Sequence, residues 1–333
     1  MIIILFLLLA IIIFPYGEGD HIYLSPYVAR IFEFSVLIYF VKSIRINYVL
    51  ITLCLFLLLV LRFKGIEYGV YTFRMILFLF IVTTRKLTPK NLYLSFFLYT
   101  VFLIFRLSQG IKEPGLFMEF NLEGILWVSL ALYIFKRITV KFWANLFLIS
   151  CLLFLILMDS KALALALFTF MFLNSHRTVR IIAMVMLAIV LLDGIDFAAI
   201  DRFSYWVAYY GYFVEGKMQV LFPIFNVEVQ GNAGEILSRM APGNYLKYGY
   251  SSSPAFHAYL LRILYDYGLI LGFALIYFHF ARVRSVLGSR LACSLGLLGL
   301  STNFVFSGFF LLSFIILGNA RFSEDTSVRS TIV

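Results

Sequence analysis

Basic, histidine and aromatic side chains concentrate in one stretch of the chain, from Asp193 to Gly272. Most of the sequence on either side of this stretch is hydrophobic. The side chains that stand out are Arg202, Trp206, Lys217, Arg239, Lys247 and His257. Guanidinium and ammonium groups pair with phosphate oxygens, and aromatic rings can stack on sugars. Gathered at a membrane surface, such groups would suit an anionic, lipid-linked substrate.

Hydrophobic helices must position these groups. The chain has 333 residues, of which 63% are hydrophobic and 13% charged, whereas a soluble domain has about 25% charged residues. Apolar segments of about 15–20 residues recur along the chain and do not alternate with polar residues. This pattern predicts an all-α polytopic membrane protein and excludes a membrane β-barrel. We expect about twelve transmembrane helices, over 1–15, 27–41, 46–61, 69–82, 91–107, 123–135, 142–158, 161–174, 179–196, 257–281, 290–303 and 305–319.

Connections that carry only basic residues alternate with connections that carry acidic residues. The basic connections hold Lys42 and Arg45; Arg85, Lys86 and Lys90; Lys136, Arg137 and Lys141; Arg177 and Arg180; and Arg282, Arg284 and Arg290. Cytoplasmic loops of membrane proteins are enriched in Lys and Arg. The alternation therefore predicts that both termini are cytoplasmic and that a large loop over 197–256 lies outside. Because no repeat or linker divides the chain, residues 1–333 are expected to form a single integral membrane domain.

Charged residues inside the predicted spans need a physical reason, because a charge at the centre of a bilayer costs at least about 2.5–3.5 kcal/mol on insertion scales. Arg74 lies in the middle of a span without a local partner, so it either snorkels to the interface or faces a cavity. Arg262 and Asp266 are four residues apart, a spacing that allows an ion pair along one helix. That pair is either purely structural or part of a site.

Two further polar positions lie where the chain meets the membrane from outside. Asp159-Ser160-Lys161 forms a corner between two apolar runs. Its opposite charges either cap the turn or place the lysine where a phosphate could bind. His257 follows a serine- and proline-containing segment at the junction of the loop with the next span. It is either a polar cap or a group that accepts a proton near neutral pH.

Several kinds of chemistry lack the residues they need in this sequence. The net charge of +10 is spread over short connections between hydrophobic segments, which membrane topology explains without a nucleic-acid partner. The sequence has no glycine-rich nucleotide-binding motif, no paired-cysteine motif and no clustered histidines. We therefore expect no cofactor and no metal site. An enzyme on the outer face would need a substrate that arrives already activated, and a lipid pyrophosphate meets that need.

Short motifs occur in a fixed order around the predicted external loop. They are Ser160-Lys161 at the start of an apolar helix, Arg202-x-x-x-Trp206 after a span, and His257-Ala-Tyr-Leu followed by Asp266-Tyr-Gly268-x-x-x-Gly272 in the span after the loop. This order resembles the O-antigen polymerase and ligase superfamily, and the resemblance covers roughly residues 150–281. The sequence departs from the family at Ala258, where an asparagine usually follows the histidine.

The resemblance implies a glycosyltransferase of the membrane-embedded GT-C type, located in the bacterial inner membrane and active at its periplasmic face. Its substrates would be undecaprenyl-pyrophosphate-linked oligosaccharides in contact with membrane lipid, and a chain-length regulator protein is a candidate partner. A hydroxyl of the acceptor glycan would attack the anomeric carbon of the donor, and undecaprenyl pyrophosphate would leave.

The same resemblance assigns roles to individual residues. Arg202 and Arg262 would stabilise the leaving pyrophosphate, and His257 would orient or deprotonate the acceptor hydroxyl. Further contacts with substrate are expected from Lys161, Arg239, Trp206, Asp266 and Arg74.

Three functions are therefore in competition. Polymerisation of repeat units into O-antigen or capsular polysaccharide is favoured by the short chain and its many Phe and Tyr residues. A ligase would transfer the same glycan to the lipid A core. A flippase or transporter for the lipid-linked oligosaccharide should have two related halves, and the sequence shows no internal repeat.

Overall fold

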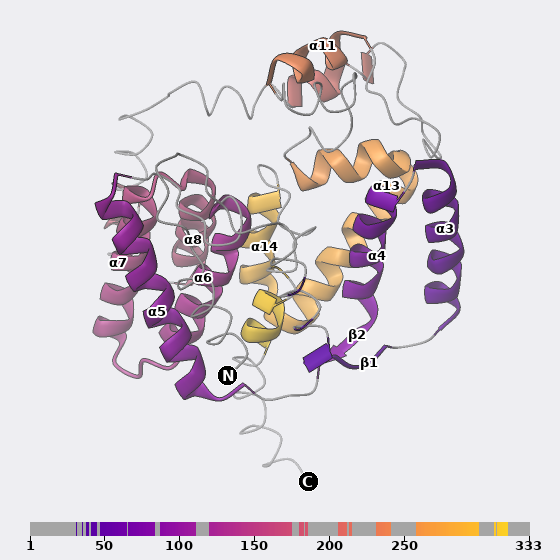
Figure 1. The fold of residues 1–333 in the computed structure, drawn as a ribbon. Helices are drawn as coiled ribbons and strands as arrows, with labels where there is room; N and C mark the ends of the chain where they lie inside the picture. The colour runs from indigo at the N-terminus through magenta and orange to yellow at the C-terminus, as the bar shows by residue number, and fades with distance from the viewer. Residues whose placement is uncertain are drawn as a thin grey trace.

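The computed structural model describes residues 31, 35, 38–39, 41–44, 47–64, 66–83, 87–110, 120–174, 180–182, 184–185, 206–211, 213–214, 231–240, 258–299, 310 and 312–318. This part of the chain is helical apart from one short two-stranded ribbon (Figure 1). The helices are α3 (Tyr48–Lys64), α4 (Ile66–Phe80), α5 (Pro89–Ser108), α6 (Phe120–Phe135), α7 (Lys141–Leu157), α8 (Lys161–Asn174), α11 (Gly231–Met240), α13 (Tyr259–Leu287) and α14 (Ser289–Gly299).

The helices occur where the hydrophobic pattern predicts them. Each predicted span from 46–61 to 161–174, together with 257–281 and 290–303, overlaps one of these helices and differs from it by six residues or fewer at either end. The described residues of the predicted span 305–319 are helical as well. The predicted span 1–15 and most of 27–41 and 179–196 lie outside the described residues.

The two strands are a departure from the all-α expectation. Strand β1 (Val41–Ile44) pairs antiparallel with β2 (Ile81–Thr83), with a bulge between Val41 and Ser43. The ribbon joins the start of α3 to the end of α4, so these two helices form a hairpin whose open end is closed by backbone hydrogen bonds. It also places two connections side by side that the charge pattern assigns to the same side of the membrane.

The helices pack as two groups. In the first, α5 packs on α6, α6 on α7 and α8, α7 on α8, and α8 on α14. We call this set the five-helix bundle. In the second, α3 packs on α4 and α4 contacts α13, which we call the three-helix group. The contact of α13 with α14 joins the two groups, and α11 lies above both of them in Figure 1.

Aromatic side chains fill the five-helix bundle. Trp127 of α6 is almost completely buried, and its ring lies 5.3 Å from the ring of Phe96 and 5.2 Å from that of Phe154. The indole Nε1–H donates a hydrogen bond of 2.9 Å to Thr100 Oγ1 on α5. One side chain therefore links α5, α6 and α7, and its polar atom is satisfied inside the core.

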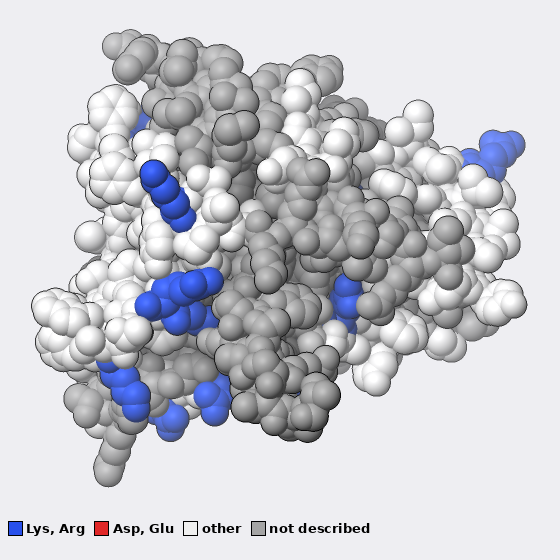
Figure 2. Space-filling view, turned by 90° about the horizontal axis from the view of Figure 1, so that it is seen from below, with Lys and Arg blue, Asp and Glu red and all other residues white. Residues whose placement is uncertain are grey.

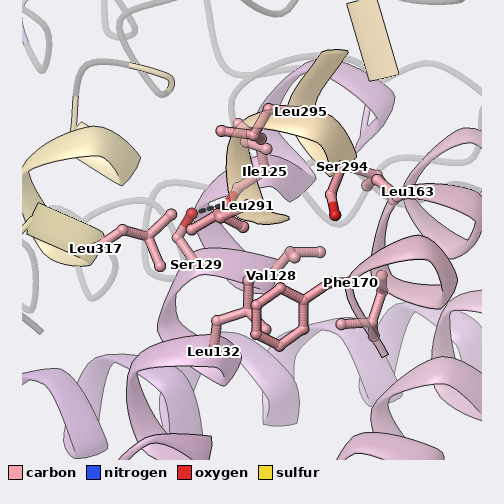
Figure 3. A pocket seen from close by; sticks show the side chains of 12 residues that line it. Ile125, Val128, Ser129, Leu132, Leu163, Phe170, Leu291, Ser294, Leu295 and Leu317 are labelled. Atoms are coloured by element: carbon pink, nitrogen blue, oxygen red, sulfur yellow. Dashed lines mark hydrogen bonds between the residues drawn. The ribbon is translucent and has the colours of Figure 1, made fainter. Parts of the chain in front are cut away.

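A small cavity lies between α6, α8 and α14 (Figure 3). Its volume is about 10 Å³, which is room for about one water molecule. The lining is apolar except for Ser129 and Ser294. These hydroxyls donate to carbonyl oxygens of their own helices, to Ile125 O at 2.7 Å and to Arg290 O at 3.0 Å. The cavity is a packing defect that is too small for a substrate.

Two of the described helices, Pro89–Ser108 and Tyr259–Leu287, are long and apolar enough to cross a membrane. Large apolar side chains are also exposed on the outward faces of several helices, among them Ile51, Leu55, Leu58, Phe97, Val101, Ile104, Phe142, Trp143 and Leu146. Apolar patches of this kind on a folded protein mark a surface that meets lipid or another partner.

Basic residues gather at one end of the molecule. Seen from below, the described residues show Lys and Arg side chains and no Asp or Glu (Figure 2). The start of α5, the turn between α6 and α7, and the turn between α13 and α14 lie together at this lower end of Figure 1. These turns carry residues from three of the connections that the charge pattern assigns to the cytoplasm.

Candidate functional site

The predicted helix over 257–281 is interrupted at Gly268. The backbone there has φ 75° and ψ 175°, a conformation that is essentially restricted to glycine. We call residues 259–267 the short limb of α13 and residues 269–287 the long limb; Figure 1 shows that they run in different directions. The long limb has 19 residues, about 28 Å of helix, whereas the short limb covers only about 13 Å.

The two limbs fold back toward each other. A Cβ atom on Gly272 would lie 3.1 Å from Leu264 Cα and 3.2 Å from Ile263 O, so the limbs approach too closely there for a larger residue. Farther from the break, the hydroxyl of Tyr259 on the short limb hydrogen-bonds to Nδ1 of His279 on the long limb. Gly268 and Gly272 together therefore give α13 the shape of a closed V.

Helix α4 is bonded to both limbs of this V. Thr72 Oγ1 donates to Tyr68 O at 2.8 Å, so the 2.6 Å contact between Thr72 and Tyr267 must have the tyrosine hydroxyl as the donor. His279 Nε2 lies 3.3 Å from Met75 O and donates to that carbonyl. Its Nδ1 is therefore left to accept the hydrogen bond from the Tyr259 hydroxyl.

Charged groups from α4 and the short limb meet at one aromatic ring. Arg262 Nε lies 3.5 Å from Asp266 Oδ2, and these side chains are only 3% and 6% exposed. The Cζ atom of Arg262 lies 4.1 Å from the ring centroid of Tyr71, and that of half-buried Arg74 lies 5.9 Å from the same centroid. We call Tyr71, Arg74, Arg262 and Asp266 the Tyr71 cluster.

The Tyr71 cluster brings two cations close to each other in the protein interior. The two Cζ distances place the guanidinium groups no more than about 10 Å apart, so like charges repel there by at least about 1.7 kcal/mol at an effective dielectric constant of 20. Stacking of a desolvated guanidinium on a tyrosine ring contributes about 2 kcal/mol in the opposite direction. The Arg262–Asp266 distance exceeds the 2.7–2.9 Å or so of a strong charge-assisted hydrogen bond. The cluster therefore holds two positive charges and one negative charge, a balance that favours the binding of a further anion.

The structure brings three of the predicted site residues together and leaves the others on separate elements. Arg74, Arg262 and Asp266 belong to the Tyr71 cluster, although Arg74 and Arg262 are 188 residues apart in sequence. Arg239 is exposed on α11, and Trp206 is half-buried in the helical stretch 206–211. His257 and Arg202 lie outside the described residues.

Lys161 lies at the corner between α7 and α8. Its Nζ atom is 3.8 Å from Asp159 Oδ1, and the two side chains are 41% and 45% exposed. Asp159 has a φ of 59°, and the amide of buried Ser160 donates to Leu155 O at 3.0 Å, which ends α7. The acidic and basic side chains of the corner therefore interact at the surface, as the capping interpretation expects.

Sequence reasoning missed most of the polar residues around the cluster. These are Tyr71, Thr72, Tyr259, Tyr267 and His279. One signal was available on α4, because Tyr68, Tyr71, Thr72 and Met75 are spaced i, i+3, i+4 and i+7 and share one helical face. Their partners on α13 could not be read from the sequence, since pairing between helices depends on the break at Gly268.

Comparison with known proteins adds no relative. No family model, no curated protein and no solved structure matches the chain. Within the part of the chain that the structure describes, no group of three or more His, Cys, Asp and Glu side chains could hold a metal ion. The residues of the site are therefore the basis for assigning a function.

Proposed function

We propose that this chain is a multi-pass glycosyltransferase of the bacterial inner membrane that polymerises undecaprenyl-pyrophosphate-linked repeat units. Both termini lie in the cytoplasm in this proposal. The loop over 197–256 and the short limb of α13 lie at the periplasmic face. The product is O-antigen or capsular polysaccharide.

The Tyr71 cluster is the observation that carries the proposal. Two arginines from different helices meet at one tyrosine ring. One of them, Arg262, follows His257 at the junction of loop and helix by five residues. The short limb of α13, which carries Arg262, lies in the half of the molecule opposite the basic lower end, where the proposal places the cytoplasm (Figure 1). A buried and a half-buried cation at the outer side of a membrane suit a substrate that brings its own negative charge, such as a lipid pyrophosphate.

The reaction needs charge stabilisation more than covalent help from the protein. A hydroxyl of the acceptor glycan attacks the anomeric carbon of the donor, the bond to the pyrophosphate breaks, and negative charge grows on the leaving group. Arg202 and Arg262 stabilise that charge, because fixed cations in a desolvated site act strongly on a developing anion. Lys161 supports them at the mouth of α8.

The acceptor needs a proton acceptor and a binding surface. His257 orients or deprotonates the attacking hydroxyl, and the proton leaves the oxygen as the glycosidic bond forms. Arg239 and Trp206 bind the glycan from the external loop, where the exposed guanidinium and the half-buried indole suit polar and stacking contacts with sugars.

One observation favours a second function, transport of the lipid-linked unit. Interrupted helices with polar groups near the break are a common feature of transporter binding sites, and α13 has this character at Gly268. The polymerase is preferred because its motif order accounts for His257, Arg202 and Lys161 together.

A comparison of surface glycans tests the proposal. Cells that lack the protein should make glycan with a single repeat unit, and complementation should restore the ladder on a gel. Arg202→Ala and His257→Ala should each give the single-unit pattern, whereas Arg137→Gln, at the end of α6, should leave the ladder intact. An intact ladder with both alanine variants would contradict the site assignment.

The same cells separate the competing functions. A ligase would leave full-length polymer unattached on the carrier lipid, which extraction of the lipid fraction would reveal. A transporter would leave no repeat units on the outer leaflet, which periplasmic enzymatic labelling of the carrier-linked sugar would detect. Single units on the outer leaflet, without polymer, are the outcome expected for a polymerase.

A further inference from the structure

Asp266 poses a problem for a site that stabilises a pyrophosphate. A carboxylate beside the leaving group repels it, yet Asp266 is buried 3.5 Å from Arg262, the cation assigned to that group. The burial of Arg262 supplies the reason for an acid at this position. A buried guanidinium without a counter-ion is strongly destabilising, so the protein needs an internal anion whenever the substrate is absent.

We propose that Tyr71, Arg74 and Arg262 form a diphosphate-binding site that Asp266 occupies until the diphosphate displaces its carboxylate from Arg262. This inference rests on the proposed function and deepens it, because it says how Asp266 controls access of the pyrophosphate to Arg262. In this proposal the Asp266 carboxylate competes with the diphosphate for Arg262 and does not itself contact the substrate.

The geometry suits an anion with two charged groups. The guanidinium groups of Arg74 and Arg262 approach one ring from two helices and lie within about 10 Å of each other. A diphosphate can offer one phosphoryl group to each guanidinium, whereas a monophosphate carries less charge and only one such group. Arg74 is half-buried and Arg262 almost fully buried, so the anion meets Arg74 first and Arg262 at the exchange step.

Exchange requires only side-chain motion. Tyr71 stacks with Arg262 at 4.1 Å independently of Asp266, so the ring keeps the guanidinium in place when the carboxylate turns away. The Thr72–Tyr267 and Met75–His279 hydrogen bonds hold α4 against both limbs of α13 on either side of the cluster. The loose 3.5 Å ion pair is then the part of the site that gives way.

Binding to the purified full-length chain in detergent tests the exchange. Farnesyl diphosphate is the probe, and farnesyl monophosphate and inorganic pyrophosphate are compared with it. Asp266→Asn keeps the shape and an acceptor oxygen but removes the competing charge, so farnesyl diphosphate should bind at least tenfold more tightly. A carboxylate that is merely structural, or one that contacts the substrate, would give unchanged or weaker binding, and either result would overturn the proposal.

Two further variants test the cations without leaving a buried charge. The double variant Arg262→Gln with Asp266→Asn removes both members of the ion pair, and it should bind farnesyl diphosphate at least tenfold more weakly than Asp266→Asn alone. Arg74→Gln should weaken diphosphate binding more than monophosphate binding. Equal losses for the two ligands would overturn the two-cation geometry. Size-exclusion chromatography checks that each variant is monodisperse.

The ring has a matched control at the other end of the molecule. Arg137 lies over Tyr133 with its Cζ atom 5.2 Å from the ring centroid, and it bonds the tyrosine hydroxyl at 3.1 Å. Tyr71→Leu should weaken farnesyl diphosphate binding at least fivefold and Tyr71→Phe should not, whereas Arg137→Gln should have no effect. Equal losses from Arg137→Gln and Tyr71→Leu would mean that any loss of a cation–aromatic pair acts through the fold, and they would overturn the assignment.

The same measurements distinguish a lipid-linked diphosphate from free pyrophosphate, and they test the diphosphate site separately from the polymerase function. Tighter binding of farnesyl diphosphate than of inorganic pyrophosphate identifies a lipid-linked ligand, and equal affinity identifies the free ion; both support the site. Tighter binding by Asp266→Asn, combined with normal glycan ladders in cells that lack the protein, would uphold the site and reject the polymerase. Single-unit glycan in those cells, combined with unchanged farnesyl diphosphate binding by Asp266→Asn, would support the polymerase and reject the exchange at Asp266.

Discussion

The five-helix bundle and the three-helix group both contain buried polar atoms, but they satisfy most of them in different ways. In the bundle, the buried hydroxyls of Ser129 and Ser294 donate to carbonyls of their own helices, and the Trp127 indole supplies a bond between helices, to Thr100. In the three-helix group, the buried polar side chains of Thr72 and His279 are bonded across helices, to the Tyr267 hydroxyl and to Met75 O. The bundle also lacks, among its described residues, a buried ion pair like that of Arg262 with Asp266.

The difference indicates which part of the molecule is scaffold. A hydroxyl bonded within its own helix adds no constraint between helices, so the bundle depends mainly on shape and dispersion. The rings packed around Trp127 illustrate this, and the Trp127–Thr100 bond adds one polar link between α6 and α5. Polar bonds between helices fix their register and orientation, at the risk of unsatisfied groups if one partner moves. The three-helix group is thus the part whose geometry is specified most closely.

The largest expected effect comes from Arg262→Leu. This variant leaves the Asp266 carboxylate buried without its partner, so the free energy of unfolding should fall by about 3–5 kcal/mol. Titration of the purified chain with a denaturing detergent measures that change. The double variant Arg262→Leu with Asp266→Leu should recover most of the loss, because it buries no charge. A single variant as stable as the wild type would show that the carboxylate is reached by water.

The next effect should come from Gly268→Ala. Alanine at φ 75° and ψ 175° is strained by about 1–3 kcal/mol. Gly288, between α13 and α14, has a similar backbone with φ 89° and ψ 162°. Gly288→Ala should therefore lower the melting temperature by a similar amount but leave farnesyl diphosphate binding unchanged, whereas Gly268→Ala should also weaken binding. Equal farnesyl diphosphate binding by the two variants would show that binding does not depend on the V shape of α13.

A smaller effect distinguishes the two classes of hydroxyl. Thr72→Val leaves the buried Tyr267 hydroxyl without its acceptor, which should cost about 1–2 kcal/mol. Ser129→Ala removes a bond within one helix and should change stability by less than about 0.5 kcal/mol. Thermal unfolding of both variants in the same detergent provides the comparison. If the serine change proved the costlier one, the bundle would depend on polar bonds after all.

Lys161→Ala should have the smallest effect on stability. Its ion pair with Asp159 is exposed and 3.8 Å long, and pairs of this kind are worth about 0–1 kcal/mol. A shift in melting temperature within the error of the measurement is expected. A shortened glycan ladder with unchanged stability would then assign the lysine to substrate, while a normal ladder would leave it as a cap of the α7–α8 corner.

The sequence predicted the positions of most described helices because long apolar runs have few alternatives. It also identified Arg74, Arg262 and Asp266, because charges in such runs are conspicuous. It could not show that Arg74 and Arg262 share Tyr71, since a tyrosine in an apolar span carries no mark of its partner. The interruption at Gly268 was hidden for a similar reason. Glycine is common in transmembrane helices, and the backbone angles that make this one indispensable depend on the fold.

The β1–β2 ribbon has a consequence for the order in which the protein is made. Its hydrogen bonds close the α3–α4 hairpin using residues 41–83 alone. This segment can therefore leave the ribosome and assemble well before the sequence of α13 has been translated. The surface of α4 that later receives the V is then already in place. The late segment docks onto a surface that is already formed, so a chain truncated after α4 should still form the α3–α4 hairpin.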